Sequence, residues 1–335
     1  MKLAIVGATG MVGREMLKIL EQKKILIEEL ILVASEKSVG KKLMFKNKKL
    51  SVISLSSVVK RKLDFALFSA GKEVSKEWAP KLAEKGCRVI DNSSYWRMCS
   101  KHKLIVPEIN GEIIDNKDMI IANPNCSTIQ LVAVLYPLHQ KYKISRVIVS
   151  TYQSVSGTGK RAFEQLQNEE RGLSSKKVYP YQIYRNVLPH CDDFEENGYT
   201  KEEMKIINET KKILDEKINI TATAARVPVL RGHSESVNIT FEKSFSIEEV
   251  KKTLENKRGI KLTDNTSNNI YPMPITSENQ NEVFVGRIRR DESFKNTINL
   301  WIVADNLRKG AATNTVQILQ KILNKTKTND SKQRI

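Results

Sequence analysis

The chain has 335 residues, of which 40% are hydrophobic and 28% charged, a composition typical of a globular protein of about two domains. No apolar run approaches the length of a membrane span, and no secretory signal is apparent, so we expect a cytoplasmic protein with no membrane partner. The formal net charge is +18, but the lysines are spread along the whole chain, which favours a lysine-rich surface over a nucleic-acid partner.

The first third of the chain alternates short apolar strands with helices. Strands are expected at Lys2–Val6, Glu29–Ala34, Phe65–Ser69, Arg88–Asp91 and Met119–Ala122, and helices at Val12–Glu21, Ser75–Lys85 and Ser127–Gln140. This alternation predicts an α/β fold with a Rossmann-type, doubly wound parallel sheet.

The first strand runs into a glycine-rich turn, Gly7-Ala8-Thr9-Gly10-Met11-Val12-Gly13. The spacing is a variant of the dinucleotide fingerprint, and it is weak evidence alone, but a strand precedes it and a helix follows. The glycines would bring backbone N–H groups against a pyrophosphate at the helix N-terminus. A glycine turn that binds nothing is the alternative.

Cys126 stands in Asn123-Pro124-Asn125-Cys126-Ser127-Thr128, between an expected strand and an expected helix. A thiol at a helix start is exposed to the positive end of the helix dipole and to unpaired backbone N–H groups, which favour the thiolate. Cys126 is therefore a candidate covalent nucleophile. An isolated cysteine is more often a small buried hydrophobe. The nucleotide-type turn favours an oxidoreductase that acts on an acyl or aldehyde carbon.

The four cysteines have no metal-ligand spacing, so we expect reduced thiols and no metal site.

From about Ser145 the pattern becomes richer in strands. These are expected at residues 147–152, 221–230, 236–241, 283–289 and 296–303, with helices at 161–169, 201–214 and 247–256. They predict a second, α+β domain with a mixed sheet. A last helix is expected at 311–322, a loop at 263–279, and a disordered polar tail at 325–335.

Three side chains could assist a thiolate nucleophile. His233 follows Gly232 between two expected strands and could act as general acid and base, although a hydrogen-bonded turn histidine is the alternative. The guanidinium group of Arg226 has paired N–H donors that fit a carboxylate, and Arg97 could bind a phosphate in the same way.

Together these segments resemble the aspartate-semialdehyde dehydrogenase family over nearly the whole chain. The resemblance implies an NADP-binding domain at 1–127, completed by the helix at about 306–324, and a catalytic and dimerisation domain at 128–305. A lysine and two hydroxyls at Ser35, Lys37 and Ser38, with no acidic residue at the strand end, favour NADP over NAD. The residues expected at NADP are Gly7, Thr9, Gly10, Met11, Val12, Gly13, Ser35, Lys37, Ser38, Ser69, Ser156, Gly157 and Asn314.

The resemblance also assigns the chemistry. Cys126 would attack the aldehyde of L-aspartate 4-semialdehyde with the help of His233. Loss of hydride to NADP would leave a thioester, which inorganic phosphate would release as L-4-aspartyl phosphate. In the cell the reverse, reductive direction would feed lysine, methionine and threonine synthesis. The expected substrate-binding residues are Arg97, Asn125, Gln153, Glu202, Lys205 and Arg226, with Arg97 and Lys205 on the phosphate, and family members generally form homodimers.

Two alternatives stay open. N-acetyl-glutamyl-phosphate reductase shares the fold and the thioester chemistry, but Asn-Cys-Ser-Thr around Cys126, rather than Gly-Cys-Tyr-Pro, argues against it. A non-catalytic nucleotide-binding scaffold would explain the basic surface, but not Cys126, Gln153, Arg226 and His233 together.

Overall fold

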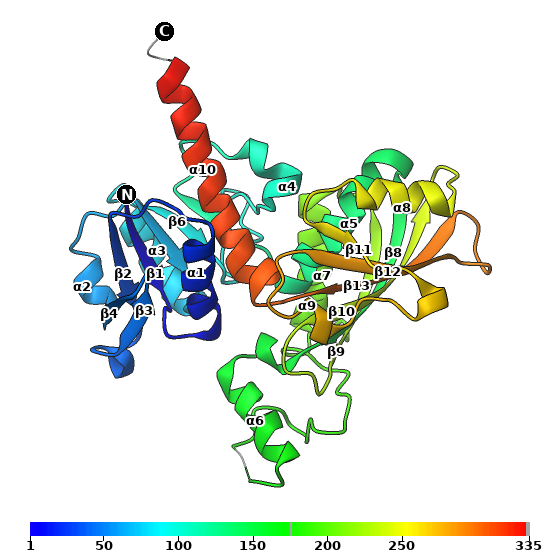
Figure 1. Ribbon diagram of the computed structural model, residues 1–335, viewed down its shortest axis with the longest axis horizontal. Helices are drawn as coiled ribbons and strands as arrows, with labels where there is room; N and C mark the ends of the chain where they lie inside the picture. Colours follow the sequence, from blue (N-terminus) through cyan, green and yellow to red (C-terminus); the bar gives the residue numbers. More distant parts are fainter. Residues whose placement is uncertain (175, 333–335) are drawn as a thin grey trace. The chain divides into compact units, whose positions relative to one another are not determined.

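The computed structural model describes residues 1–174 and 176–332 (Figure 1). It divides into two compact units, one of Met1–Pro124 with Ala311–Ile335 and one of Asn125–Gly310. The sequence-based boundaries, at 127/128 and 305/306, fall a few residues from these. As a result Cys126 lies in the second unit and not, as predicted, in the first, because the helix that it begins packs into the second core.

The first unit contains a seven-stranded sheet in the order β3-β4-β2-β1-β5-β6-β7. Its neighbours pair parallel except β3 with β4. The strands are β1 (Lys2–Val6), β2 (Glu29–Val33), β3 (Lys42–Phe45), β4 (Lys48–Ile53), β5 (Phe65–Phe68), β6 (Arg88–Asp91) and β7 (Ile120–Ala122).

Helices cover both faces of this sheet. Leu3 and Ile5 of β1 pack with α1 (Met11–Gln22) and α10 (Thr313–Lys332), which lie side by side in Figure 1. Ala4 and Val6 point to the other face, toward α3 (Lys72–Ala83). The doubly wound prediction is confirmed. Shorter helical segments are α2 (Leu55–Val58), α4 (Pro107–Asn110) and the 3₁₀ turns Glu36–Ser38 and Gly111–Ile113.

Two features of the first unit differ from the prediction. The lysine-rich segment after β2 forms the hairpin β3–β4, closed by Lys46 and Asn47 at positive φ. Its two-residue turn lacks glycine, the usual sign of such a hairpin. At the other end, α10 continues to Lys332 through most of the tail expected to be disordered, because extending a formed helix requires no new nucleation. Residues 333–335 of that tail lie outside the described residues.

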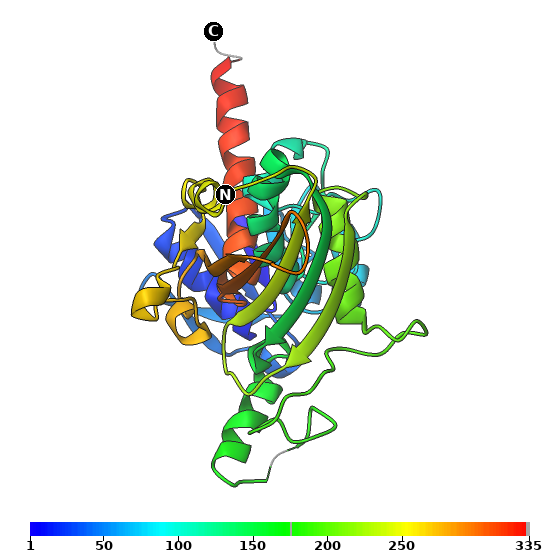
Figure 2. The same cartoon turned by 90° about the vertical axis from the view of Figure 1, so that its right-hand side faces the viewer.

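The second unit contains a mixed sheet, as predicted, in the order β11-β12-β13-β10-β8-β9. It has six strands and not the five expected, because the short β11 joins its edge. Figure 2 shows its long, curved strands. The strands are β8 (Ile144–Gln153), β9 (Asn219–Arg226), β10 (His233–Phe241), β11 (Ile260–Leu262), β12 (Val283–Arg290) and β13 (Thr297–Ala304). The helices are α5 (Cys126–Tyr142), α6 (Lys160–Glu170), α7 (Lys201–Ile213), α8 (Ile247–Glu255) and α9 (Pro274–Ser277). Short turns lie at Val155–Gly157 (3₁₀), Thr266–Asn268 (3₁₀) and Arg308–Ala312 (π).

One face of this sheet packs against α5, α7 and α8 to form the core of the unit. The opposite face carries the exposed Tyr152 and the half-buried Trp301, whose ring centroids are 5.4 Å apart, whereas Ser234 and Val303 on that face are buried. None of the described helices combines the length with the hydrophobicity that a membrane crossing requires.

The strands around His233 differ from the prediction. β9 ends at Arg226, four residues early, because Pro228 has no N–H to donate to a strand partner. Gly232, at φ +90°, then turns the chain so that β10 begins at His233 itself. His233 is therefore a strand residue and not a turn residue.

Candidate active site

Glycine is required at the turn between β1 and α1. Gly7 has φ +89°, and a Cβ there would lie 2.2 Å from the carbonyl oxygen of Ser69. A Cβ on Gly13 would lie 2.3 Å from the carbonyl oxygen of Gly7. Gly10 is the N-cap of α1 and brings no capping side chain, while Thr9, Met11 and Val12 are partly exposed along the turn. The turn therefore fits a pyrophosphate at the start of α1.

The segment that follows β2 lies next to this turn, because the backbone N–H groups of Gly7 and Ala8 both donate to the carbonyl oxygen of Val33, at 2.8 and 3.0 Å. Ser35 and Lys37 are exposed there, whereas Ser38 is buried. Of the three residues predicted to favour NADP over NAD, Ser35 and Lys37 thus have side chains that a cofactor can reach.

Arg97 and Asn314 belong to the same unit, near the carboxyl ends of β6 and β7. The Arg97 guanidinium donates to the carbonyl oxygens of Asn123 and Asn92, at 3.0 and 2.7 Å. The Asn314 amide donates to Asn123 Oδ1 at 2.8 Å and to the Ile105 carbonyl at 3.0 Å. These bonds fix both side chains, and their roles toward phosphate and cofactor stay predictions.

Cys126 is the first residue of α5, as the sequence predicts to within one position. Asn125 caps this helix, since its Oδ1 accepts from the N–H of Ser127 and of Thr128, at 2.9 and 3.3 Å. Cys126 itself is half-buried, and a Cβ on Gly310 would come within 2.8 Å of the Cys126 Cβ. The helix dipole favours a thiolate at this position.

Glu202, in the first turn of α7, connects the other predicted residues of the second unit. Its Oε1 accepts from Asn125 Nδ2 at 2.9 Å and from Gln153 Nε2 at 3.1 Å, and its Oε2 pairs with Lys205 Nζ at 3.2 Å. Burial raises the pKa of Glu202, but Lys205, Asn125, Arg226 and Gln153 together bring it below the ordinary value. Glu202 is therefore a buried carboxylate that orients its neighbours.

The His233 ring is fully buried and is fixed from one side. Its Nδ1 lies 3.0 Å from the backbone nitrogen of Ser154 and 3.1 Å from Ser154 Oγ. Within the described residues Nε2 has no hydrogen-bond partner. Burial, and then the positive charge of Arg226, lower the pKa of His233 to about 3. The ring is thus neutral near pH 7 and has one nitrogen available for chemistry.

Arg226 ends β9 beside Gln153, the last residue of β8, with which it is paired in the parallel register. Its Nη1 donates to the Ser154 carbonyl at 2.8 Å. A Cβ on Gly157 would lie 2.9 Å from this Nη1 and 3.0 Å from His233 Nε2. The missing side chain of Gly157 therefore allows this turn to approach both the arginine and the histidine.

Sequence reasoning did not assign roles to three residues that hold this arrangement. Asn306 Oδ1 accepts from Ser154 Oγ, Ser156 Oγ and the N–H of Gly232. Glu209 accepts the N–H of Asn125 at 2.6 Å, and Asp192 pairs with Lys205. Glu209 follows Glu202 by seven residues, the spacing of one helix face, and this was the available signal. The Asn306 contacts join distant parts of the chain, and the 13 residues that separate Asp192 from Lys205 follow no regular spacing.

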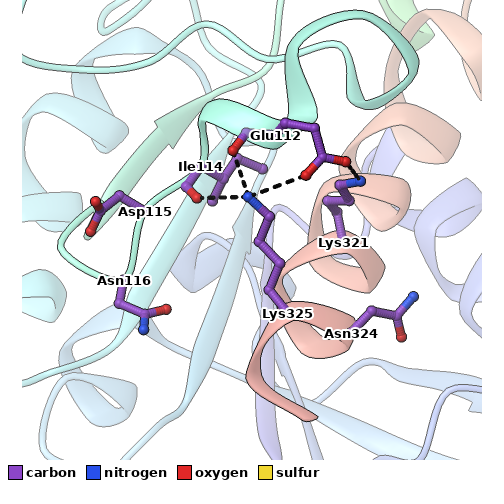
Figure 3. Close-up of a pocket in the computed structure, with 7 residues that line it drawn as sticks. All are labelled: Glu112, Ile114, Asp115, Asn116, Lys321, Asn324 and Lys325. Carbon is purple, nitrogen blue, oxygen red and sulfur yellow. Dashed lines mark hydrogen bonds and ion pairs between the residues drawn. The ribbon is translucent and has the colours of Figure 1, made fainter. Parts of the chain in front are cut away.

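A separate pocket of the first unit lies outside these residues. It has a volume of about 590 Å³ and is lined by residues of α10 and of the segment 112–116. Figure 3 shows Lys321 and Lys325 of α10 directed at Glu112. These contacts attach α10 to its own unit, and neither a predicted site residue nor Cys126 lines the pocket.

Comparisons with known proteins agree with this arrangement. Residues 2–117 match the family described as semialdehyde dehydrogenase, NAD binding domain, and residues 135–309 match its dimerisation domain. The aspartate-semialdehyde dehydrogenase of Aquifex aeolicus is 52% identical, over 95% of this chain and 97% of its own length. That of Legionella pneumophila is 47% identical, over 96% and 95% of the two chains.

Solved structures give the same result. The crystal structure of aspartate semialdehyde dehydrogenase II from Vibrio cholerae, complexed with ASA, has a TM-score of 0.93 to this chain at 42% identity. The match covers 96% of this chain and 98% of the Vibrio chain.

Proposed function

The chain belongs to the aspartate-semialdehyde dehydrogenase family, and we propose that it interconverts L-aspartate 4-semialdehyde and L-4-aspartyl phosphate with NADP, through a thioester on Cys126. It is an oxidoreductase of amino-acid biosynthesis. The observation that carries the proposal is the hydrogen-bonded network that joins the Cys126 helix start, Gln153 and Glu202, with Arg226 and His233 bound to the adjoining Ser154.

The first unit supplies the cofactor site. The turn at Gly7 and Gly13 has room for backbone contacts to a pyrophosphate and none for side chains. Ser35 and Lys37 offer a hydroxyl and a cation for the additional phosphate of NADP. NADP, when bound, accepts the hydride that the substrate carbon loses.

Cys126 supplies the nucleophile. In the oxidative direction its thiolate, which the start of α5 favours, forms a bond to the aldehyde carbon, and the electron pair of the C=O bond moves onto the oxygen. The N–H groups at the start of α5, together with the Asn125 amide, could stabilise the oxyanion that develops on the former aldehyde oxygen. After hydride loss the carbon is a thioester, which phosphate attacks, so that Cys126 leaves as the thiolate.

His233 acts through Nε2. Because Nδ1 accepts the N–H of Ser154 and the pKa is lowered to about 3, the neutral ring carries its proton on Nε2, from which it can donate to the oxyanion that forms on the substrate. Ser154, at Nδ1, holds the ring in one orientation.

Arg226, Gln153 and Lys205 bind the substrate. The Nε of Arg226 has no hydrogen-bond partner within the described residues, and its guanidinium fits the substrate carboxylate. Gln153, anchored on Ser127 Oγ at 3.1 Å and on Glu202, orients the reacting chain. Lys205 offers a positive charge to phosphate.

The chain is proposed to form a homodimer in the cytoplasm. The exposed Tyr152 and the half-buried Trp301 lie on the sheet face away from α5, α7 and α8, and the family model that residues 135–309 match is a dimerisation domain.

The test is phosphate-dependent reduction of NADP by L-aspartate 4-semialdehyde, with N-acetyl-glutamate semialdehyde as the competing substrate. We expect NADPH only with the aspartyl substrate and phosphate, and none from Cys126→Ser. Turnover of the acetylated substrate alone would assign the chain the reductase activity instead, and normal turnover by Cys126→Ser would exclude the thioester.

A further inference from the structure

Glu235 is a buried carboxyl that the proposed chemistry does not use. It follows His233 by two residues in β10, so both side chains project from the same face of the sheet. That face also carries Val237, which packs against α5 in the core. Glu235 is fully buried, and within the described residues neither of its carboxyl oxygens has a hydrogen-bond partner of ordinary geometry. Its cross-strand neighbours are the uncharged Thr151 and Ile302.

Gln130 approaches this carboxyl from the helix. It follows Cys126 by four residues in α5, and side chains at that spacing lie on one helix face. Gln130 is fully buried, and its Nε2 lies 3.4 Å from the carbonyl oxygen of His233, to which it donates. Its Oε1 has no partner within the described residues.

These two side chains complement each other. Burial raises the pKa of Glu235 well above its ordinary value, and the influence of Gln130 offsets only part of this rise. A buried carboxyl without a cation is stable as the neutral acid, which carries an O–H donor. Gln130 Oε1 is an acceptor without a donor within the described residues, so the neutral acid and the amide are complementary.

We propose that the carboxylic acid of Glu235 and the amide of Gln130 form a neutral clamp that fixes the backbone of His233 to the helix beginning at Cys126. Glu235 is then a positioning residue for the acid–base step, so this inference rests on the proposed function. The clamp acts on the backbone of His233, while Ser154 holds the ring. The two contacts together define where Nε2 lies relative to the start of α5.

The experiment compares Glu235→Leu with Glu235→Gln in the phosphate-dependent assay. Leucine fills the site but cannot hydrogen-bond, and we expect kcat to fall about tenfold or more, because small displacements of catalytic groups are costly, while KM for the semialdehyde changes less than about threefold. Glutamine keeps a donor and an acceptor without a charge, and it should restore most of kcat. Val237→Ala, two residues along the same face, is the control for general loosening of the core and should leave kcat close to wild type.

Gln130→Met removes the other half of the clamp without touching Glu235. It should lower kcat with the same small effect on KM, and the double variant with Glu235→Leu should be no slower than the slower single variant, because both break one connection. Should Glu235→Leu fail to fold, Gln130→Met and Glu235→Gln decide alone.

Three results would overturn the clamp: wild-type kcat in Glu235→Leu or in Gln130→Met, equal losses in Glu235→Gln and Glu235→Leu, or multiplicative losses in the double variant. Absence of activity in the wild-type enzyme would count against the proposed function itself, and the two failures are therefore distinguishable.

Discussion

At the scale of single residues, the site is controlled by which buried groups are charged. Glu202 keeps its charge because Lys205, Arg226 and two amides surround it, whereas burial lowers the pKa of His233 and raises that of Glu235, which favours the neutral form of each. A neutral histidine whose Nδ1 accepts the Ser154 N–H carries its proton on Nε2 and is suited to donate a hydrogen bond from there. The lowered pKa values of Glu202 and His233 mean that the fold loses stability as pH falls, whereas the raised pKa of Glu235 means that it loses stability as pH rises.

Arg226 provides the first prediction. Arg226→Leu removes the proposed carboxylate partner, and we expect KM for L-aspartate 4-semialdehyde to rise about tenfold or more, since charge-assisted pairs contribute about 1.5–3 kcal/mol. Steady-state kinetics at saturating NADP and phosphate would measure this rise. An unchanged KM would show that another cation binds the carboxylate.

Glu235 provides a prediction about stability. Its folded pKa lies above the value of about 4.3 for an unfolded chain, so the unfolded state loses the proton first and stability falls as pH rises above that value. Glu235→Gln removes this penalty. We expect its free energy of unfolding to exceed that of the wild type at pH 8, by a margin that shrinks toward pH 5. Urea titrations at several pH values would measure the margin, and one that grows toward low pH would contradict the assignment.

At the scale of elements, the start of α5 is a junction. Asn125 caps the helix with its oxygen and binds Glu202 of α7 with its amide nitrogen, and Glu209 of the same helix accepts its backbone N–H. The position of the nucleophile therefore depends on a helix cap, and the capping residue, Asn125, also carries the amide proposed at the oxyanion.

Asn125→Ala tests this junction. Loss of a cap costs about 0.5–2 kcal/mol, and here it also leaves Glu202 with one donor fewer, so we expect both the free energy of unfolding and kcat to decrease. Ser246→Ala is the matched control, because Ser246 accepts the N–H of Glu249 as the cap of α8, a helix in which no site residue is predicted. It should lose a similar amount of stability and keep its kcat. An equal loss of kcat in both variants would mean that capping stability alone, and not the junction, is responsible.

Most elements could be predicted from local sequence, and the exceptions have identifiable causes. The Gly7 turn and the helix start at Cys126 depend on residues that are neighbours in the chain, so their patterns are visible. The hairpin at Lys46 and Asn47 lacks the glycine that usually marks such turns. The role of Asn306 depends on contacts about 150 positions away in the chain, and a single sequence contains no signal for them.

At the scale of the whole molecule, the fold class and the family follow from the sequence, whereas the association of copies does not. The β8–β10–β13 face away from α5, α7 and α8 carries Tyr152 and Trp301 in ring contact, with Ile148 half-buried on β8. Aromatic side chains accessible on a sheet face are typical of an interface. Because a two-fold interface uses the same patch twice, a charge placed on it is introduced in pairs.

Trp301→Glu should therefore convert the proposed homodimer to monomer at micromolar concentration. Leu26→Glu is the control, since Leu26 is 84% exposed in the first unit. Sedimentation velocity would distinguish the two variants. A dimer that survives Trp301→Glu, or that dissociates equally in Leu26→Glu, would show that another surface holds the copies together.

The central claim of this account is the thioester on Cys126, and one measurement tests it directly. The enzyme would be mixed with L-aspartate 4-semialdehyde and NADP without phosphate, and both NADPH and the mass of the Cys126 peptide would be followed. We predict a burst of about one NADPH per site, an acyl group on Cys126, and release of that group when phosphate is added. A burst that leaves Cys126 unmodified, or an acyl group on another residue, would contradict the account.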